Sequence, residues 1–400
     1  MSAPRDNPDQ GRPSGSPATL GEVARSYLRL GLTAFGGPAA HLAFMRSELV
    51  LRRRWVDEQE LLDLIGGASL LPGPTSTEVA LMLARRRRGW AALALGGACF
   101  ILPSVLLVLG LSWAYVRYGT TNAGAGLLAG IKPVVVAIIA SAVMGLARTA
   151  LKSWLLGAVA VAGLGCYLAG VSPLFILLGG GLIVMLAENR DRWPKALPGG
   201  PGPTAPLAAF STSVGRHLGA GSPRLTRPSL AGVFFEFLKL GSVVFGSGYV
   251  LVSYLRDDLV STGHWLTGPE LLAAVAIGQV TPGPVFTTAT SIGYFVGGLP
   301  GAVLATVAIF LPSFVLVAAL MPVLARARRS SWGAAALDGV NAAAVALMVG
   351  VSVQLGQASL TGWFTAMVGV VSLGALVRWR VNSTWLVLGG AAAGLVHMLA

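Results

Sequence analysis

Charged residues are scarce in this sequence. Only 11% of the 400 residues are Asp, Glu, Lys or Arg, whereas 54% are hydrophobic. A soluble domain carries roughly 25% charged residues. This balance excludes an ordinary soluble protein and predicts a polytopic membrane protein.

Acidic residues, cysteines and catalytic motifs are also few. The 29 basic residues outnumber 16 acidic ones, but the arginines fall in short clusters between apolar segments, as in cytoplasmic loops, and do not indicate a nucleic-acid surface. The two cysteines, Cys99 and Cys166, lie in apolar runs, which excludes a disulfide framework and a zinc site. No Walker, His-Glu-x-x-His or Gly-x-Ser-x-Gly motif occurs, so we expect no enzyme, cofactor or metal site.

The chain divides into four parts. Residues 1–20 lack the apolar core of a cleavable signal peptide and are rich in Pro, Gly and Ser, so we expect a disordered tail. Residues 21–187 contain six apolar segments, several of them about 20 residues long and able to span a bilayer as helices. Residues 188–229 carry Pro-Gly-Gly-Pro-Gly-Pro and predict a flexible cytoplasmic linker, and 230–400 hold six more apolar segments.

The second set of segments repeats the first. A shift of 210 positions makes 16 of the 54 positions from Arg25 to Glu78 identical, including Pro72-Gly73-Pro74 with Pro282-Gly283-Pro284. Beyond a one-residue gap, Leu102-Pro103-Ser104 matches Leu311-Pro312-Ser313. The sequence therefore predicts two homologous membrane repeats.

The arginines indicate that the two repeats are inverted. Arg85–Arg88 follow the Pro-Gly-Pro segment of the first repeat, whereas the equivalent loop near Gly297 has no basic residue; the next loop shows the opposite bias. Lys and Arg concentrate on the cytoplasmic side, so the copies should lie upside down relative to each other, as in many secondary transporters. An inverted pair needs an odd number of crossings per half, so one of the six segments should dip in and return. We predict an all-α polytopic membrane protein of two inverted-topology repeats with broken, re-entrant helices.

Both Pro-Gly-Pro stretches interrupt apolar segments. Proline removes a backbone donor and glycine adds freedom, so a helix breaks there. In a bilayer the freed backbone groups are tolerated only where protein or water covers them, and such breaks at matching points mark a transporter's binding site. The first segment of each half has a second weak point, Phe35-Gly36-Gly37-Pro38 in one and Gly246-Ser247-Gly248 in the other.

Polar residues near the breaks are the remaining candidates for an anion site. Half-helix N-termini offer N–H groups to an anion, and nearby hydroxyls, amides and ammonium groups can add to them: Thr75, Ser76, Thr77, Thr281, Thr287, Thr288, Gln279, Asn341, Lys132 and Lys239. Lys132 either snorkels to a membrane face or binds the anion, and Arg29 holds the place of Lys239 in the first half. Glu78 and His41 are candidate proton carriers. Glu78 can instead be a structural partner for Lys132 or an arginine, and His41 can instead form a hydrogen bond between helices.

These motifs resemble the chromate ion transporter family in its long, two-domain form. Phe35-Gly36-Gly37-Pro38, His41, Trp55 and Leu71–Thr75 are similar to its first half. Its second-half motifs are matched by Phe237–Ser242, Phe245–Tyr249, Gly278–Phe286 and Asp338–Asn341. The similarity covers residues 22–400, and one departure is the unusually basic stretch Ala84–Arg88.

The resemblance implies chromate export across the bacterial inner membrane by a multi-pass protein, driven by the proton gradient as in an antiporter. It also implies that the two first-half motifs, Phe35–Pro38 and Pro72–Pro74, belong to the functional core. Sulfate or another tetrahedral oxyanion remains an alternative substrate. A non-transporting membrane sensor or a permease subunit is the alternative from another class. The expected partners are the oxyanion, protons and the lipid bilayer, and the sequence leaves a homo-oligomer open.

Overall fold

The computed structural model describes residues 19–34, 37–69, 71–119, 121–190, 227–244, 250–327, 330–379 and 381–399. Most of these residues are helical and they include no β-strand, which confirms the predicted all-α class. The predicted N-terminal tail, apart from its last residues, and most of the predicted linker lie outside the described residues. The first repeat contains α1 (Leu20–Thr33), α2 (Gly37–Met45), the π-helical η1 (Arg46–Arg52), α3 (Glu58–Ala68), α4 (Thr75–Tyr118), α5 (Asn122–Ala150), α6 (Trp154–Leu168) and α7 (Pro173–Glu188).

The second repeat reproduces these elements almost residue for residue. It contains α8 (Leu230–Val243), α9 (Val250–Leu255), the π-helical η4 (Arg256–Thr262), α10 (Gly268–Val280), the 3-10 turn η5 (Val285–Thr287), α11 (Thr288–Ala327), α12 (Ser331–Ser359), α13 (Trp363–Arg378) and α14 (Ser383–Leu399). Local details match too. Asp57 and the equivalent Thr267 each cap the helix that follows, and Arg54 and the equivalent His264 each have φ of 52°. The sequence repeat is therefore a structural repeat.

The first Pro-Gly-Pro stretch forms the tip of a helical hairpin. It separates α3 from α4, and Arg86, eleven residues into α4, forms an ion pair with Glu60 at the start of α3. The two helices must therefore run antiparallel from this tip. This is the geometry expected of a segment that dips into a membrane and returns.

Helix α4 then reverses direction at Arg88 and Gly89. Gly89 has φ 68° and ψ −151°, a region open essentially to glycine alone. A methyl group at Gly96 would touch the side chain of Ala84, which is impossible along one straight helix. Helix α11 reverses in the same way at Gly298, with φ 62° and ψ −153°, and Thr290 Oγ1 lies 2.7 Å from Thr306 Oγ1 across the turn.

Four helical stretches in the described part of the chain are long and apolar enough to cross a membrane. They are Thr75–Tyr118, Asn122–Ala150, Val285–Leu320 and Trp332–Gln357. Five shorter apolar helices of 10–17 residues accompany them. These helices make the chain a multi-pass membrane protein.

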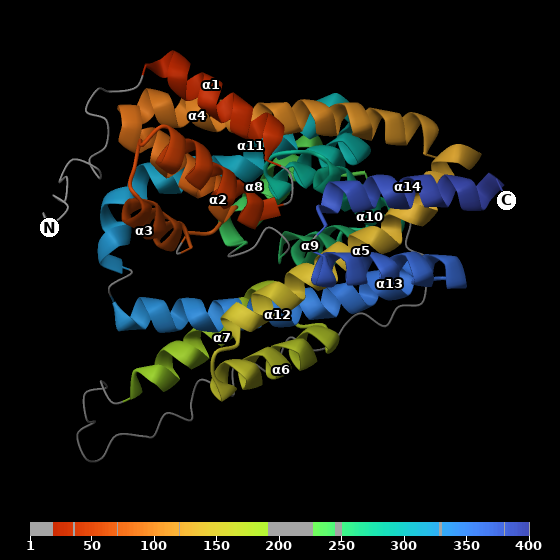
Figure 1. The fold of residues 1–400 in the computed structure, drawn as a ribbon. Helices are drawn as coiled ribbons and strands as arrows, with labels where there is room; N and C mark the ends of the chain where they lie inside the picture. The colour runs from red at the N-terminus through yellow and green to blue at the C-terminus, as the bar shows by residue number, and fades with distance from the viewer. Residues whose placement is uncertain are drawn as a thin grey trace, which may run out of the picture.

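The helices form two bundles (Figure 1). The hairpin bundle comprises α1–α4 and α8–α11, in which α1 packs on α4, α8 on α11 and α4 on α11. The companion bundle comprises α5–α7 and α12–α14, in which α12 packs on α5, α6 and α7, and α14 and α13 pack on α5. Equivalent helices α5 and α12 run antiparallel, since Lys152 lies 3.8 Å from Asp338 while a methyl group at Gly356 would lie 3.8 Å from Val136.

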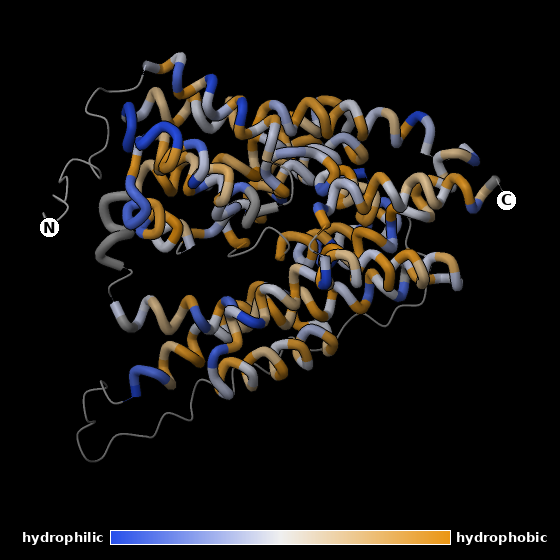
Figure 2. The backbone as a smooth tube through the Cα atoms, in the orientation of Figure 1, coloured by the Kyte–Doolittle hydropathy of each residue, from blue (hydrophilic) through white to orange (hydrophobic). Residues whose placement is uncertain are grey.

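The two bundles meet mainly through the second repeat. Helix α10 packs on α5, α12 and α14, and α9 packs on α12. Their first-repeat equivalents, α3 and α2, have no comparably extensive packing on the companion bundle within the described residues. Polar residues gather at the end of the molecule where α2 and α3 meet, and the long helices are largely apolar (Figure 2).

Candidate functional site

Each Pro-Gly-Pro stretch is a tight non-helical turn that contributes one backbone donor. The prolines have no N–H group, so the glycine N–H is the donor that remains. Gly73 has φ 135° and Gly283 has φ 97°, both in the region that favours glycine. Pro74 caps the start of α4 and Pro284 caps η5, so each turn leads directly into a helix N-terminus.

The two turns bind the opposite repeats. Gly73 N donates a hydrogen bond to Val244 O at 2.7 Å, and Gly283 N donates to Ala34 O at 3.1 Å. Ala34 and Val244 are the residues that end α1 and α8, and they are equivalent under the 210-residue shift. The structure therefore brings four helix interruptions, two from each repeat, to one centre.

Glu78 is buried at this centre. Its side chain is fully buried, and neither carboxyl oxygen accepts a hydrogen bond of regular geometry from the described residues. A methyl group at Gly73 would overlap both Glu78 Oε1 and Ser313 Oγ, so these groups crowd the turn. The hydroxyl of Thr77 is likewise buried without a partner in the described part of the chain. The buried hydroxyl of Ser313 faces the Glu78 carboxyl without forming a hydrogen bond of regular geometry.

The equivalent corner of the second repeat has no carboxyl. Thr288 replaces Glu78 and donates its hydroxyl to Val285 O at 2.8 Å. Ser104, the equivalent of Ser313, lies 3.0 Å from Thr287 Oγ1, and Thr281 donates to Gly278 O. Gln279, next to this turn, is 5% exposed, and its Nε2 has no partner among the described residues.

His41 lies on α2 beside the first turn of α4. Its Nδ1 lies 3.1 Å from Ser76 Oγ, and its ring meets Phe100 edge-on with centroids 5.7 Å apart. Its Nε2 is buried and has no partner within the described residues. Ser76, expected to bind substrate, is thus placed to orient His41, while Thr75 occupies the first position of α4.

The two lysines expected at the site have different surroundings. Lys239 forms ion pairs with Glu236 at 2.5 Å and Asp258 at 3.0 Å, so its charge is already neutralised. The equivalent Arg29 pairs with Glu48, which occupies the place of Asp258. Lys132 is half-buried on α5 of the companion bundle, and Asn341, its equivalent, is partly buried on α12.

Part of the expected site lies outside the described residues. This applies to Phe35, Gly36, Gly246, Ser247 and Gly248. For Gly37 and Pro38 the structure gives the backbone, which begins α2. Their expected role in binding stays a prediction.

Ser104 and Ser313 are site residues that the sequence reasoning did not select. Both follow a proline inside a long helix, and each reaches the Pro-Gly-Pro turn of the opposite repeat: a methyl group at Gly283 would lie 2.9 Å from Ser104 Cβ. The signal was the matched Leu-Pro-Ser triplet at equivalent positions of both repeats, which served only to align them.

Buried polar atoms are normally hydrogen-bonded, so those left without partners call for water or a ligand. At this centre the unpartnered groups include hydroxyls, an amide, an imidazole nitrogen and one carboxyl, next to the N-termini of α4 and α11. Such groups can replace the hydration shell of a small polar solute. The fold and the centre define a class: a duplicated polytopic membrane transport protein whose interrupted helices meet inside the molecule.

Comparison with known proteins identifies the family within this class. The model of the chromate transporter family matches residues 21–185 and again 231–395, and the chain belongs to that family. It is 32% identical over 383 residues to a chromate transport protein of Cupriavidus metallidurans, covering 94% of this chain and 93% of the relative. A probable chromate transport protein of Synechococcus elongatus is 31% identical, with 91% of each chain covered. A chromate transport protein of Pseudomonas aeruginosa is 30% identical, with 96% of this chain and 93% of the relative covered. No solved structure matches the chain.

Proposed function

We propose that this protein exports chromate across the bacterial inner membrane and that the oxyanion binds where the two Pro-Gly-Pro turns meet. The exchange of backbone hydrogen bonds between Gly73 and Val244 and between Gly283 and Ala34 carries this proposal. It joins the interrupted segments of both repeats, which is where many secondary transporters bind their solutes. The names of the relatives supply the substrate class.

Chromate is a tetrahedral dianion, and leaving it bare in hydrocarbon would cost tens of kcal/mol. The helix N-termini of α4 and α11 with the hydroxyls of Thr77 and Ser313 and the amide of Gln279 offer donors in place of water. Lys239 is left out of this set, because two carboxylates already neutralise it. The membrane potential favours exit of the dianion by about 2.3 kcal/mol per charge per 100 mV.

Glu78 is the proposed proton site, and its position determines whether proton binding strengthens or weakens oxyanion binding. A charged carboxylate repels a dianion held nearby, whereas a protonated carboxyl can donate a hydrogen bond to it. Proton binding at Glu78 and oxyanion binding therefore strengthen each other by the same factor. A proton bound there leaves with the oxyanion, which is symport. The antiport that the family resemblance implies would require the proton and the oxyanion to bind at different steps of the cycle, and the flux measurement below distinguishes the two.

The unequal packing of the two repeats supports alternating access. Leu62 on α3 is 54% exposed, whereas its equivalent Leu272 on α10 is fully buried against the rest of the molecule. The equivalent pair Phe44 and Tyr254 differ in the same way, since Phe44 is 39% exposed and Tyr254 is 3% exposed. Inverted repeats can exchange such environments, so in the proposed cycle the hairpin bundle moves until α3 docks on the companion bundle and α10 is released.

Proteoliposomes containing this protein alone test the function. Chromate flux is measured with the pH gradient and the voltage set independently, and sulfate is measured in parallel. Chromate flux that responds to voltage and to pH supports the proposal and gives the direction of coupling. Flux of sulfate without chromate assigns another oxyanion substrate, and no flux of either supports a permease subunit or a sensor.

A further inference from the structure

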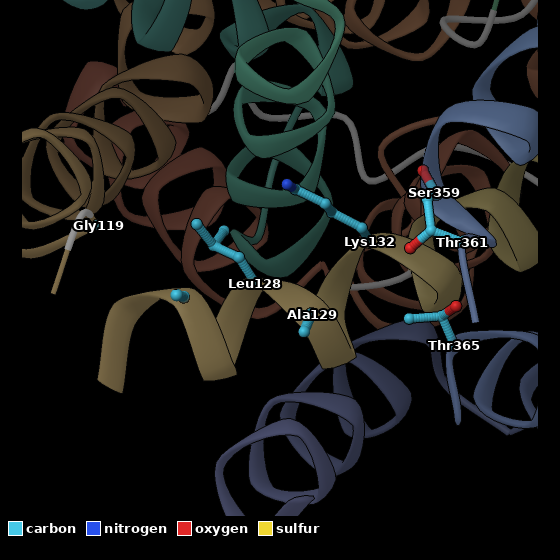
Figure 3. A pocket seen from close by; sticks show the side chains of 8 residues that line it. Gly119, Leu128, Ala129, Lys132, Ser359, Thr361 and Thr365 are labelled. Atoms are coloured by element: carbon cyan, nitrogen blue, oxygen red, sulfur yellow. The ribbon is translucent and has the colours of Figure 1, made fainter. Parts of the chain in front are cut away.

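A cavity separate from the Pro-Gly-Pro centre surrounds Lys132. It has a volume of about 430 Å³ and lies between the first half of α5, the end of α4 and the start of α13. Its lining is formed by Gly119, Ala125, Leu128, Ala129, Lys132, Ser359, Thr361 and Thr365. Figure 3 shows the Lys132 side chain extending from α5 toward the green helices of the second repeat, while Ser359, Thr361 and Thr365 lie on the opposite side of its base.

The charge in this cavity is not neutralised by the described residues. Lys132 is half-buried about 15 Å along α5 from its start, and no carboxylate in the described part of the chain forms an ion pair with it. The Ser359 side chain is 4% exposed, and its hydroxyl has no partner among the described residues. An ammonium group and a free hydroxyl in one cavity suit an anion.

The other repeat supplies an internal comparison. A shift of 209 positions places Asp338 at Ala129, Asn341 at Lys132 and Lys152 at Thr361. Lys152 there lies 3.8 Å from Asp338, so the equivalent location contains a cation with its own counter-ion. The Lys132 cavity has Ala129 in place of that carboxylate and carries its lysine at a different position, where the other repeat has Asn341. This makes it the more positive of the two locations.

The cavity borders the centre and lies toward one end of the helices that line it. Ile131 and Val280 pack on one apolar cluster with Val134 and Ile138, so this part of α5 lies beside the segment that leads into the second Pro-Gly-Pro turn. Gly119 in its lining follows the last residue of α4, at the far end of that helix from Arg85–Arg88. Since arginine clusters favour the cytoplasmic side, the cavity lies toward the extracytoplasmic side.

We propose that this cavity is an exit vestibule for the oxyanion, with Lys132 as its charged residue. This inference rests on the proposed function and names a second site on the same route. The volume accommodates a tetrahedral oxyanion with several waters, each of which takes about 30 Å³ in the liquid. The vestibule receives the dianion from the centre and holds it weakly before release.

Inhibition by external anion tests the vestibule. Chromate export is measured in proteoliposomes with increasing chromate, and separately sulfate, on the extracytoplasmic side. Lys132→Gln is expected to raise the inhibitory concentration of either anion about fivefold, the effect of one partly solvated charge interaction. Lys132→Arg is expected to behave as wild type, and Ala129→Asp, which restores the carboxylate of the other repeat, should act as Lys132→Gln does.

Lys152→Gln is the matched control, because it removes a lysine already paired with Asp338. Unchanged inhibition in both Lys132→Gln and Ala129→Asp would overturn the vestibule while leaving chromate export intact. Absence of chromate export in the wild type would instead reject the proposed function. The vestibule would then be tested by inhibition of sulfate flux by external sulfate in the same variants.

Discussion

Two glycines determine whether the centre can form. Gly73 and Gly283 combine left-handed backbone angles with close neighbours, so a side chain there meets strain and overlap together. The flanking prolines restrict the chain, and the glycine N–H makes the bond to the other repeat. A residue of the smallest size thus links two halves of the molecule.

We expect Gly73→Ala and Gly283→Ala to abolish transport and lower stability. The left-handed backbone alone costs an L-residue roughly 1–2 kcal/mol, and overlap with Ser313 or Ser104 adds to it. Thermal unfolding of the purified protein and chromate flux would measure the two effects. Gly165→Ala, in open space on α6, is the control and should leave flux unchanged without lowering stability. Wild-type flux in Gly283→Ala would remove that turn from the site.

Glu78 gives the site a dependence on pH with a fixed sign. Because proton and oxyanion binding favour each other there, the apparent affinity for chromate should rise as the pH falls. Glu78→Gln imitates the protonated carboxyl and should keep high affinity without pH dependence. Glu78→Thr copies the residue of the second repeat, Thr288, and should also lose the pH dependence. An unaltered pH profile of flux in both variants would reject Glu78 as the proton site.

At the scale of elements, the reversals of α4 and α11 shape the hairpin bundle. Each long helix is two helices joined at Gly89 or Gly298, which folds the part after the Pro-Gly-Pro turn back against the rest. The apolar segments in the sequence placed this break near residues 85–88, and the arginines marked it as a loop. The structure adds that it is a reversal within a few residues.

Gly89→Ala measures the conformational free energy that the positive φ at this reversal costs a residue with a side chain. No atom lies within 4 Å of the position a methyl group would take, so the cost is conformational and should be about 1–3 kcal/mol. Gly110→Ala, also on α4 and also in open space, should instead stabilise the helix by up to about 1 kcal/mol. Denaturation midpoints of the two variants would compare them. Equal midpoints would mean that the reversal at Gly89 is not a feature of the folded protein.

At the scale of the whole molecule, the two repeats have the same fold and different surroundings. The second-repeat hairpin is docked on the companion bundle, and the first-repeat hairpin has no comparably extensive packing on it among the described residues. The sequences of the two hairpins already differ in polarity, since α3 carries Glu58, Glu60 and Asp63 and α10 carries Glu270 alone. Which of them packs on the companion bundle is seen in the tertiary structure.

Reciprocal labelling would test whether the two environments exchange. In a background with Cys99 and Cys166 replaced, Leu62→Cys should react with a membrane-impermeant maleimide and Leu272→Cys should not. Conditions that drive chromate through the protein should slow the first reaction and speed the second. If both rates stay constant during transport, the proposed movement between bundles is wrong.

The sequence by itself determined the duplication, the helical class and the positions of the breaks. These are local properties: proline and glycine act on their own backbone, and hydrophobic length decides whether a helix can span a membrane. Only the tertiary structure decided which groups meet across the repeats. It paired each glycine with the opposite repeat, gave Lys239 two carboxylates and Lys132 none in the described residues, and added Ser104 and Ser313 to the centre. Such pairings depend on how helices distant in sequence pack, and no local pattern encodes them.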